Sequence, residues 1–393
     1  MGTLSNLTVA GYPILTLKNS YYQEAVNLLF TEFDFIDEQR INANRNHLVW
    51  GNQFDGNEDE YTFRGFVQTA EVCKQRLEIY GHSLKKARIE FESVKQSAID
   101  DGHYGFSVRK VSFKNYIETI NLIIANGMIH YDELYTNFTE SLITDELSFY
   151  GLSFETYLYC VLSVLPPDSV IEYELNDLHE SGYISIEAVK QIKREKIIVI
   201  TEGKTDSEFI SASLRILHPN LFPYYHFIDF SNNDFKHESN ASTLVKLVTA
   251  FFALNIRHHV IAIFDNDTAG RHELGRIHVD KLPFNIKAIK FPNINLANRY
   301  PTIGPTGVKR MNVNELACGI EMYLGEDILK EDGKLIPIQW KGYNDKMQQY
   351  QGQISQKEFV QAKFRDKLKA GNGVNSIEMI QLLNVILKAY LNS

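Results

Sequence analysis

Two short acidic motifs hold the residues best suited to chemistry. The first is EGKTD (residues 202–206), which follows a run of apolar residues, and the second is DNDTAG (265–270), which follows another. Residues i and i+2 of an extended segment point to the same side, so Asp265 and Asp267 can offer both carboxylates to one place. Carboxylate oxygens without His or Cys suit Mg²⁺ or Mn²⁺ rather than zinc. If the two strands are neighbours, Glu202 reaches the same crevice, and burying three anions together costs several kcal/mol unless a cation neutralises them. The motifs therefore favour a metal site.

Each motif also has a purely structural interpretation. An acidic residue after a strand often serves only as the N-cap of the following helix. Glu is a poor N-cap type, however, and a single cap does not need two Asp at i and i+2. The presence of both motifs, in order along the chain, favours the metal site over two separate caps.

The elements around these motifs alternate between strand and helix. The pattern predicts strands at 197–200, 224–230, 259–264 and 284–291, and helices at 206–217, 242–255 and 268–279. The first strand is wholly apolar and β-branched, as expected for a strand buried on both faces. This alternation predicts an α/β domain with a parallel sheet, in which ligands bind beyond the carboxyl ends of the strands.

The flanking regions predict a chain of several domains. Residues 1–166 are expected to form a mixed α+β and helical domain, with strands and turns in the first 60 residues. Helices are expected at 69–99 (broken near Gly81), 113–126, 139–150 and 154–165. Residues 167–196 are interpreted as linker and helix, with Pro166–Ser169 as the best linker candidate. Residues 197–295 form the α/β domain, and 296–393 are expected to be mainly helical, with a basic excess over 341–369.

Composition excludes several classes of protein. The chain has 393 residues, of which 44% are hydrophobic and 23% charged, so it can build real cores. Three scattered cysteines exclude a disulfide framework or a zinc ribbon. The net charge of -9 is not typical of a nucleic-acid-binding protein, although a basic groove can lie on an acidic protein. Neither a signal peptide nor an apolar membrane-spanning run is visible, so a cytoplasmic protein is expected.

The two motifs resemble those of the TOPRIM domain, which is shared by primases, topoisomerases and the nucleases of the OLD (overcoming lysogenization defect) family. The resemblance covers about residues 197–295, and EGKTD is most similar to the OLD-type branch. The stretch RLEIYG (76–81) also resembles the domain that precedes TOPRIM in HEPN/Toprim-type proteins. A bacterial-type primase would need a zinc module, and a topoisomerase would need a larger DNA gate.

The resemblance implies roles for particular residues. It makes Glu202 a metal ligand or general base, and Asp265 and Asp267 metal ligands. The further candidates it implies are Asp206 as an additional ligand, Lys204 as a phosphate contact, Glu321 as a later acidic ligand and Lys357 as a catalytic lysine. The implied activity is that of an Mg²⁺- or Mn²⁺-dependent endonuclease acting on DNA or RNA, tRNA included, in antiviral defence or a toxin-like system. A separate ATPase subunit is an implied partner, a membrane is not, and homo-oligomer formation is left open.

Two other functions compete with the nuclease. A strand followed by DNDT also resembles the haloacid-dehalogenase phosphatases, in which the first Asp, here Asp265, becomes phosphorylated; that interpretation leaves the EGKTD motif unexplained. The chain could instead be a non-catalytic TOPRIM-containing assembly protein. Arg76 and His82 fit the loose R-x(4-6)-H pattern of HEPN ribonucleases, but we assign them no catalysis. Ile198 stands where a Walker A motif needs glycine, so no P-loop ATPase is expected.

Overall fold

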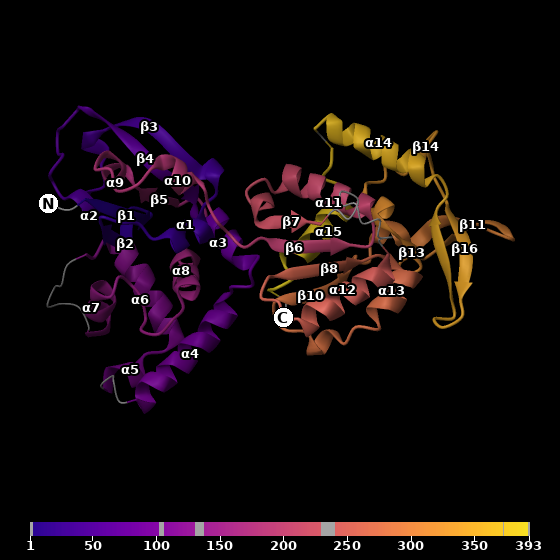
Figure 1. Ribbon diagram of the computed structural model, residues 1–393, viewed down its shortest axis with the longest axis horizontal. Coiled ribbons are helices and arrows are strands. Elements are labelled where there is room, and N and C mark those ends of the chain that lie inside the picture. The colour runs from indigo at the N-terminus through magenta and orange to yellow at the C-terminus, as the bar shows by residue number, and fades with distance from the viewer. Residues whose placement is uncertain (1–2, 102–105, 130–136, 229–239, 372, 392–393) are drawn as a thin grey trace. The chain divides into compact units, whose positions relative to one another are not determined.

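The computed structural model describes residues 3–101, 106–129, 137–228, 240–371 and 373–391. The chain divides into two compact units, residues 1–194 and 195–393 (Figure 1). Within the described residues, no helix is long and apolar enough to cross a membrane.

The first unit is built on a five-stranded antiparallel sheet of order β2-β1-β5-β4-β3. Its strands are β1 (Leu4–Val9), β2 (Tyr12–Lys18), β3 (Phe35–Ile41), β4 (Glu60–Thr69) and β5 (Val170–Glu174). Its helices are α1 (Gln23–Leu29), η1 (Glu32–Asp34), η2 (Asn42–Asn44), α2 (His47–Trp50), α3 (Ala70–Glu78), α4 (Leu84–Asp100), α5 (Phe106–Lys110), α6 (Phe113–Asn126), α7 (Asn137–Thr144), α8 (Phe154–Ser163), α9 (Asn176–Glu180) and α10 (Ile186–Lys190). The strands and turns expected in the first 60 residues are present.

Several helices of this unit begin at Ser or Thr caps, and α3, α4 and α6 pack against α8. The expected break near Gly81 separates α3 from α4, and Ser83 caps α4 by accepting a hydrogen bond from the Lys86 backbone. Helix α8 is buried along most of its length and packs against α3 and α4. The expected linker, Pro166–Ser169, lies inside this unit as the turn between α8 and β5. Strand β5, which follows this turn, lies between β1 and β4, which precede it. The sheet is therefore built from segments on both sides of the turn, and the turn does not separate two domains.

The partly buried imidazole of His82 makes the stability of the protein depend on pH. Burial, reinforced by Lys86, lowers the pKa of His82 to about 4, against the 6.5 of an exposed histidine. Between these values the unfolded chain binds more protons than the folded one, so stability falls as the pH drops from about 6.5 to about 4. We expect His82 to contribute up to about 3 kcal/mol of this loss. Urea unfolding of wild type and His82→Gln at several pH values measures it, and equal pH profiles would contradict the prediction.

The second unit contains the expected parallel sheet, of order β10-β8-β6-β7. Its strands are β6 (Ile197–Thr201), β7 (Tyr225–Phe227), β8 (Val260–Phe264) and β10 (Ile286–Lys290), and its helices are α11 (Lys204–Leu217), η3 (Phe222–Tyr224), α12 (Ala241–Ala253), α13 (Thr268–Leu274) and η4 (Val279–Lys281). Every residue of β8 is buried, because helices cover both faces of the sheet. Helices α12 and α13 pack together on one face, and α11 packs against β6 (Figure 1). The α/β prediction is confirmed, while residues 229–230 of the expected strand 224–230 lie outside the described residues.

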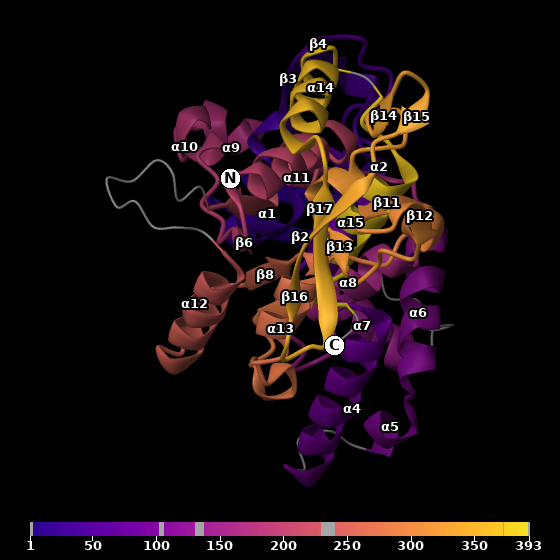
Figure 2. The same cartoon turned by 90° about the vertical axis from the view of Figure 1, so that its right-hand side faces the viewer.

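The region 296–393 is not mainly helical, and this part of the predicted fold is wrong. It contains β11 (Tyr300–Gly304), β12 (Gly307–Met311), β13 (Ala317–Cys318), β14 (Lys330–Glu331), β15 (Lys334–Leu335), β16 (Ile338–Asn344) and β17 (Gln349–Ile354), with β9 (Asn266–Asp267) as the partner of β13. Helical segments are η5 (Asn295–Arg299), η6 (Ile320–Tyr323), α14 (Lys357–Lys369) and α15 (Ile377–Leu387). Four strands form a mixed sheet of order β12-β11-β16-β17, seen towards the viewer in Figure 2. Its strands are rich in Gln, Lys and aromatic residues, which hides the alternation typical of a half-buried strand.

Candidate metal centre

The two acidic motifs follow adjacent strands. Strands β6 and β8 are hydrogen-bonded neighbours, with Thr201 opposite Ile263, so Glu202 and Asp265 leave the same edge of the sheet. Their contact is direct: the backbone N–H of Asp265 donates to Glu202 Oε1 at 2.8 Å. The structure thus brings the first acid of each motif together, as expected for a parallel sheet.

Asp206 is fixed by the loop that precedes it. Its Oδ2 accepts a hydrogen bond of 2.8 Å from the backbone N–H of Gly203, and the hydroxyl of Thr201 donates to the Gly203 carbonyl at 2.8 Å. The Asp206 side chain is buried in the first turn of α11. Lys204 begins the same helix but is exposed, so it lies outside the buried carboxylate cluster.

Asp267 is both a member of the cluster and a helix cap. Its Oδ1 accepts from the backbone N–H of Gly270 at 2.7 Å, and its Oδ2 accepts from the Gln351 amide. The capping interpretation therefore holds for this residue. Gly270 is required by the close packing, because a Cβ atom there would lie 2.7 Å from Glu202 Oε1 and 2.5 Å from the Asp265 carbonyl.

Asp265 differs from Asp267 because part of its carboxylate has no partner. Its Oδ1 is buried and accepts no hydrogen bond from any described residue. A buried oxygen without a partner is costly, and such atoms in native structures often face an ion. Asp265 is therefore the carboxylate in this cluster best prepared to bind a cation.

Glu321 reaches the cluster although it is distant in sequence. Strand β13 pairs with β9, placing Cys318 opposite Asn266, and the chain then turns into η6, which holds Glu321. A Cβ atom on Gly319 would lie 3.2 Å from Glu321 Oε2 and 3.4 Å from Asp265 Oδ2, so the two carboxylates flank one glycine. Glu321 is buried, as is Oδ1 of Asp265, and the absence of a side chain at Gly319 permits their approach.

Lys357 completes the group from α14. Its Nζ lies 3.3 Å from Glu321 Oε1, which also accepts from the Gln361 amide at 2.7 Å. Helix α14 is held on α11 by an edge contact between Phe364 and Phe209, with ring centroids 4.9 Å apart. The lysine is about half exposed, so it can meet a ligand from solvent.

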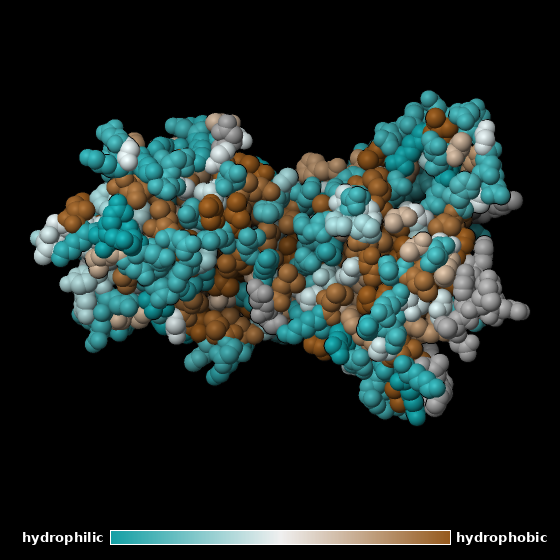
Figure 3. All heavy atoms as spheres, turned by 180° about the vertical axis from the view of Figure 1, so that it is seen from behind, coloured by the Kyte–Doolittle hydropathy of each residue, from teal (hydrophilic) through white to brown (hydrophobic). Residues whose placement is uncertain are grey.

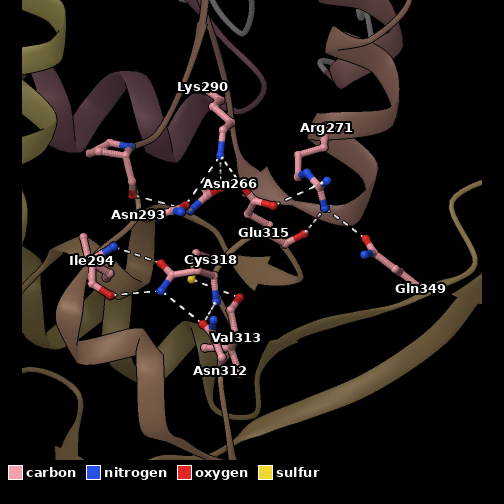
Figure 4. Close-up of polar contacts among 12 residues, drawn as sticks. Asn266, Arg271, Lys290, Asn293, Ile294, Asn312, Val313, Glu315, Cys318 and Gln349 are labelled. Carbon is pink, nitrogen blue, oxygen red and sulfur yellow. Dashed lines mark hydrogen bonds and ion pairs between the residues drawn. The ribbon is translucent and has the colours of Figure 1, made fainter.

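A second layer of polar contacts positions the loop between the two aspartates (Figure 4). Lys290 donates to the Oδ1 of buried Asn266 at 2.9 Å and pairs with Glu315 at 3.0 Å. Glu315 also lies 3.4 Å from Arg271, which donates to Gln349 at 2.9 Å. These contacts fix β9 and α13, and through them the directions of Asp265 and Asp267.

The crowded carboxylates raise one another's pKa. Burial, with Asp267 and Asp206 as further causes, raises the pKa of Glu202 to about 8, and burial with Glu321 raises the pKa of Asp206 to about 7. Burial and the surrounding acids likewise raise the pKa of Asp265 well above its usual value. Burial alone would lower the pKa of Lys357, but Glu321 raises it. The cluster is therefore short of positive charge.

The donor set fits a hard divalent cation. It consists of carboxylate oxygens, and one of them, Asp265 Oδ1, is buried without a partner. Over the described ranges, no three His, Cys, Asp or Glu side chains already stand in an arrangement that would hold an ion. The backbone and amide hydrogen bonds of Asp206 and Asp267 orient these side chains and use only part of their lone pairs, so their carboxylates can still accept an ion.

The sequence patterns did not indicate the amides that hold this cluster. Gln351 and Gln361 come from β17 and α14 and contact Asp267 and Glu321, respectively. No motif marks them, because a glutamine on a strand or helix is usually a surface residue. Glu321 and Lys357, by contrast, were named from the resemblance; the structure places them beside the cluster, and their roles stay predictions.

The fold and site define a class of protein: an α/β unit with a parallel sheet, carboxylates at its strand ends, and a separate α+β unit before it. The family model HEPN/Toprim N-terminal domain 1 matches residues 1–197, half of the chain, and the match ends close to the end of the first unit. The chain therefore belongs to the HEPN/Toprim N-terminal domain 1 family, which confirms the resemblance to HEPN/Toprim-type proteins. No curated protein and no solved structure matches it.

Membership of this family associates the chain with a nuclease-like or Toprim-related role, and a nuclease-like domain implies a nucleic-acid substrate. Toprim domains generally bind Mg²⁺.

Proposed function

We propose that this protein is a metal-dependent endonuclease whose site is the cluster of Glu202, Asp206, Asp265, Asp267 and Glu321. The observation that supports this most directly is the buried, unpartnered oxygen of Asp265 within a group of carboxylates that raise one another's pKa. Such a group is stable with all its charges only when a cation joins it. The same cluster lies where open α/β sheets bind their ligands.

The positions of the residues suggest a different role for each of them in the proposed reaction. Glu202, Asp265 and Asp267 would hold Mg²⁺ or Mn²⁺, with Asp206 and Glu321 as further ligands, and the bound ion would supply Lewis acidity towards a phosphodiester. Lys357, half exposed beside Glu321, would stabilise negative charge that develops on the phosphate. Where Glu202 does not hold the ion, it would act as the general base, the other role that the resemblance implies for it. Exposed Lys204 would contact a backbone phosphate beside the site.

The wider role is part of the same proposal and is supported by the resemblance to OLD-type nucleases. It includes DNA or RNA as the substrate, control by a separate ATPase subunit, and an effector role in antiviral defence or a toxin-like system. The proposal also includes a TOPRIM-like domain over residues 197–295 and a cytoplasmic location.

The test is cleavage of labelled DNA and of total tRNA by the full chain with Mg²⁺, Mn²⁺ or EDTA. Cleavage that needs the ion and stops in EDTA supports the nuclease. Hydrolysis of p-nitrophenyl phosphate without any nucleic-acid cleavage would favour the phosphatase that uses Asp265. Calorimetric titration with Mg²⁺ gives a second readout, and a chain that binds no ion would support the assembly protein instead.

Gln351 should act as a positioning residue for Asp267. Its amide donates to Asp267 Oδ2 and accepts from the Ala269 backbone at 2.9 Å, so it orients the carboxylate and the start of α13 together. We expect Gln351→Leu to weaken Mg²⁺ binding about 10–100-fold, the usual cost of losing a group that orients a ligand.

Calorimetry on Gln351→Leu and on Gln353→Leu measures this effect. Gln353 is exposed on the same strand, and its variant should bind as wild type. Equal affinities for the two variants would show that the Gln351 contact does not position the ligand.

A further inference from the structure

The mixed sheet of the second unit carries an exposed row of aromatic rings. Tyr343 and Tyr350 face each other across β16 and β17, with ring centroids 5.0 Å apart, and they are 50% and 58% exposed. Trp340 lies 6.1 Å from Tyr350 and continues the row. We call Trp340, Tyr343 and Tyr350 the aromatic platform.

Glycines in the neighbouring strands shape this platform. Cβ atoms on Gly304 and Gly352 would lie 3.5 Å and 3.0 Å from the indole of Trp340, so the ring lies over two positions without side chains. The strand register places Trp340 opposite Gly352, on the same face as both tyrosines. The rings are therefore supported by the sheet while the tyrosines remain accessible, as they would be for stacking with a flat ligand.

Basic residues accompany the rings. The segments 300–311 and 338–354 contain Lys309, Arg310, Lys341 and Lys346, against the single acid Asp345, in a chain whose net charge is -9. Strand β12 is exposed along its whole length, and Lys309 pairs with Thr302, which in turn pairs with Ile338 of the strand that carries Trp340. Lys309 therefore lies on the face of the platform. Figure 3 shows, from behind, that hydrophobic residues also interrupt the hydrophilic surface elsewhere, so hydrophobic exposure alone would not single out this face. What distinguishes the face of the platform is the combination of aromatic rings and positive charge.

The platform is connected to the carboxylate cluster through β17. The carbonyl of Tyr350 accepts a hydrogen bond of 2.8 Å from the Thr268 hydroxyl, and the next residue, Gln351, contacts Asp267. A chain stacked on Tyr350 would thus lie beside the loop that carries both aspartates.

We infer that the aromatic platform binds single-stranded nucleic acid, with bases stacked on Tyr343, Tyr350 and Trp340 and phosphates near the surrounding lysines. Stacking on aromatic rings is open to every base, and the positive charges complement the phosphate backbone. A duplex hides the faces of its bases, so single strands are the preferred ligand. This inference deepens the proposed nuclease function, on which it rests, by naming the form of the substrate.

Fluorescence anisotropy of labelled 20-nucleotide DNA and RNA strands, measured with the full chain in EDTA, tests binding without cleavage. We expect Tyr343→Ala with Tyr350→Ala to weaken binding by about 10-fold or more, and the corresponding Phe pair to bind as wild type because Phe keeps the ring. Tyr183→Ala is the matched control, since Tyr183 is 54% exposed in the first unit. Lys309→Gln should reduce the salt dependence of binding.

Several results would overturn the platform: no binding by wild type, equal binding by the Ala pair, an equal loss in the Phe pair, or tighter binding of duplex. A failure of the nuclease proposal gives a different result: the protein would show no metal-dependent cleavage but would still bind single strands in EDTA. Conversely, metal-dependent cleavage together with unchanged binding by the Ala pair would support the nuclease proposal and contradict the inference about the platform.

Discussion

Asp265→Asn is expected to lower metal-dependent cleavage about 10³-fold or more while leaving the protein folded. The substitution keeps the shape of the side chain but removes the charge of the carboxylate in this cluster that has an oxygen buried without a described partner. Loss of a single group on which the catalytic site depends costs a factor of this size. Cleavage rates of labelled substrate with Mg²⁺ and Mn²⁺, at equal protein concentration, measure the effect.

The same substitution, Asp265→Asn, should raise the stability of the metal-free protein although it lowers cleavage. Burial and the neighbouring acids raise the pKa of Asp265, so the carboxylate destabilises the folded state at neutral pH. Asp265→Asn removes that cost and should raise the melting temperature in EDTA. Mg²⁺ should then raise the melting temperature of wild type, through binding to the folded state only, and leave that of the variant unchanged.

Asp280→Asn provides the matched control, because Asp280 is an exposed aspartate in the same unit. It should cleave, melt and respond to Mg²⁺ as wild type does. Full activity in Asp265→Asn would remove Asp265 from the site, and a Mg²⁺-dependent shift in that variant would place the ion elsewhere.

The sequence predicted the parallel sheet well because its strands are buried on both faces. A wholly apolar run such as that of β8 has few alternatives, and its position between helical segments fixes the connection. Neighbouring parallel strands then place the residues that follow them side by side, which brings Glu202 to Asp265. Each of these acids directly follows its own strand, so a short stretch of sequence is enough to predict where it lies.

The later parts of the site depend on contacts between segments far apart in sequence. Glu321 comes into place through the two-residue pairing of β13 with β9, which no periodicity can indicate. Gln351 acts from β17, in a region expected to be helical, where the strands were hidden by polar residues. The prediction of Glu321 and Lys357 came from the family resemblance rather than from any pattern in the residues.

Asp34→Ala is expected to destabilise the first unit by about 3–5 kcal/mol, because it leaves a buried guanidinium without its counter-ion. Arg76 is completely buried, and its Nη1 donates to Asp34 Oδ2 at 2.6 Å and to the Leu29 carbonyl at 2.6 Å. Denaturant unfolding measures the loss. Asp37→Ala is the control, since Asp37 pairs with Arg64 near the surface at 3.3 Å and should cost about 1 kcal/mol or less.

A double variant separates a structural role of Arg76 from a catalytic one. Replacing both partners, Arg76→Met with Asp34→Leu, removes the unpaired charge and should recover most of the stability lost in Asp34→Ala, because apolar groups of similar size can substitute for a buried ion pair. If Arg76 only supports the core, this folded double variant cleaves nucleic acid at the wild-type rate. If Arg76 and His82 formed a ribonuclease site, the double variant would be stable and inactive towards RNA, and the assignment of chemistry to the second unit alone would be wrong. The burial of Arg76 favours the first result, since a side chain enclosed by Asp34 and Leu29 has no surface to offer a phosphate.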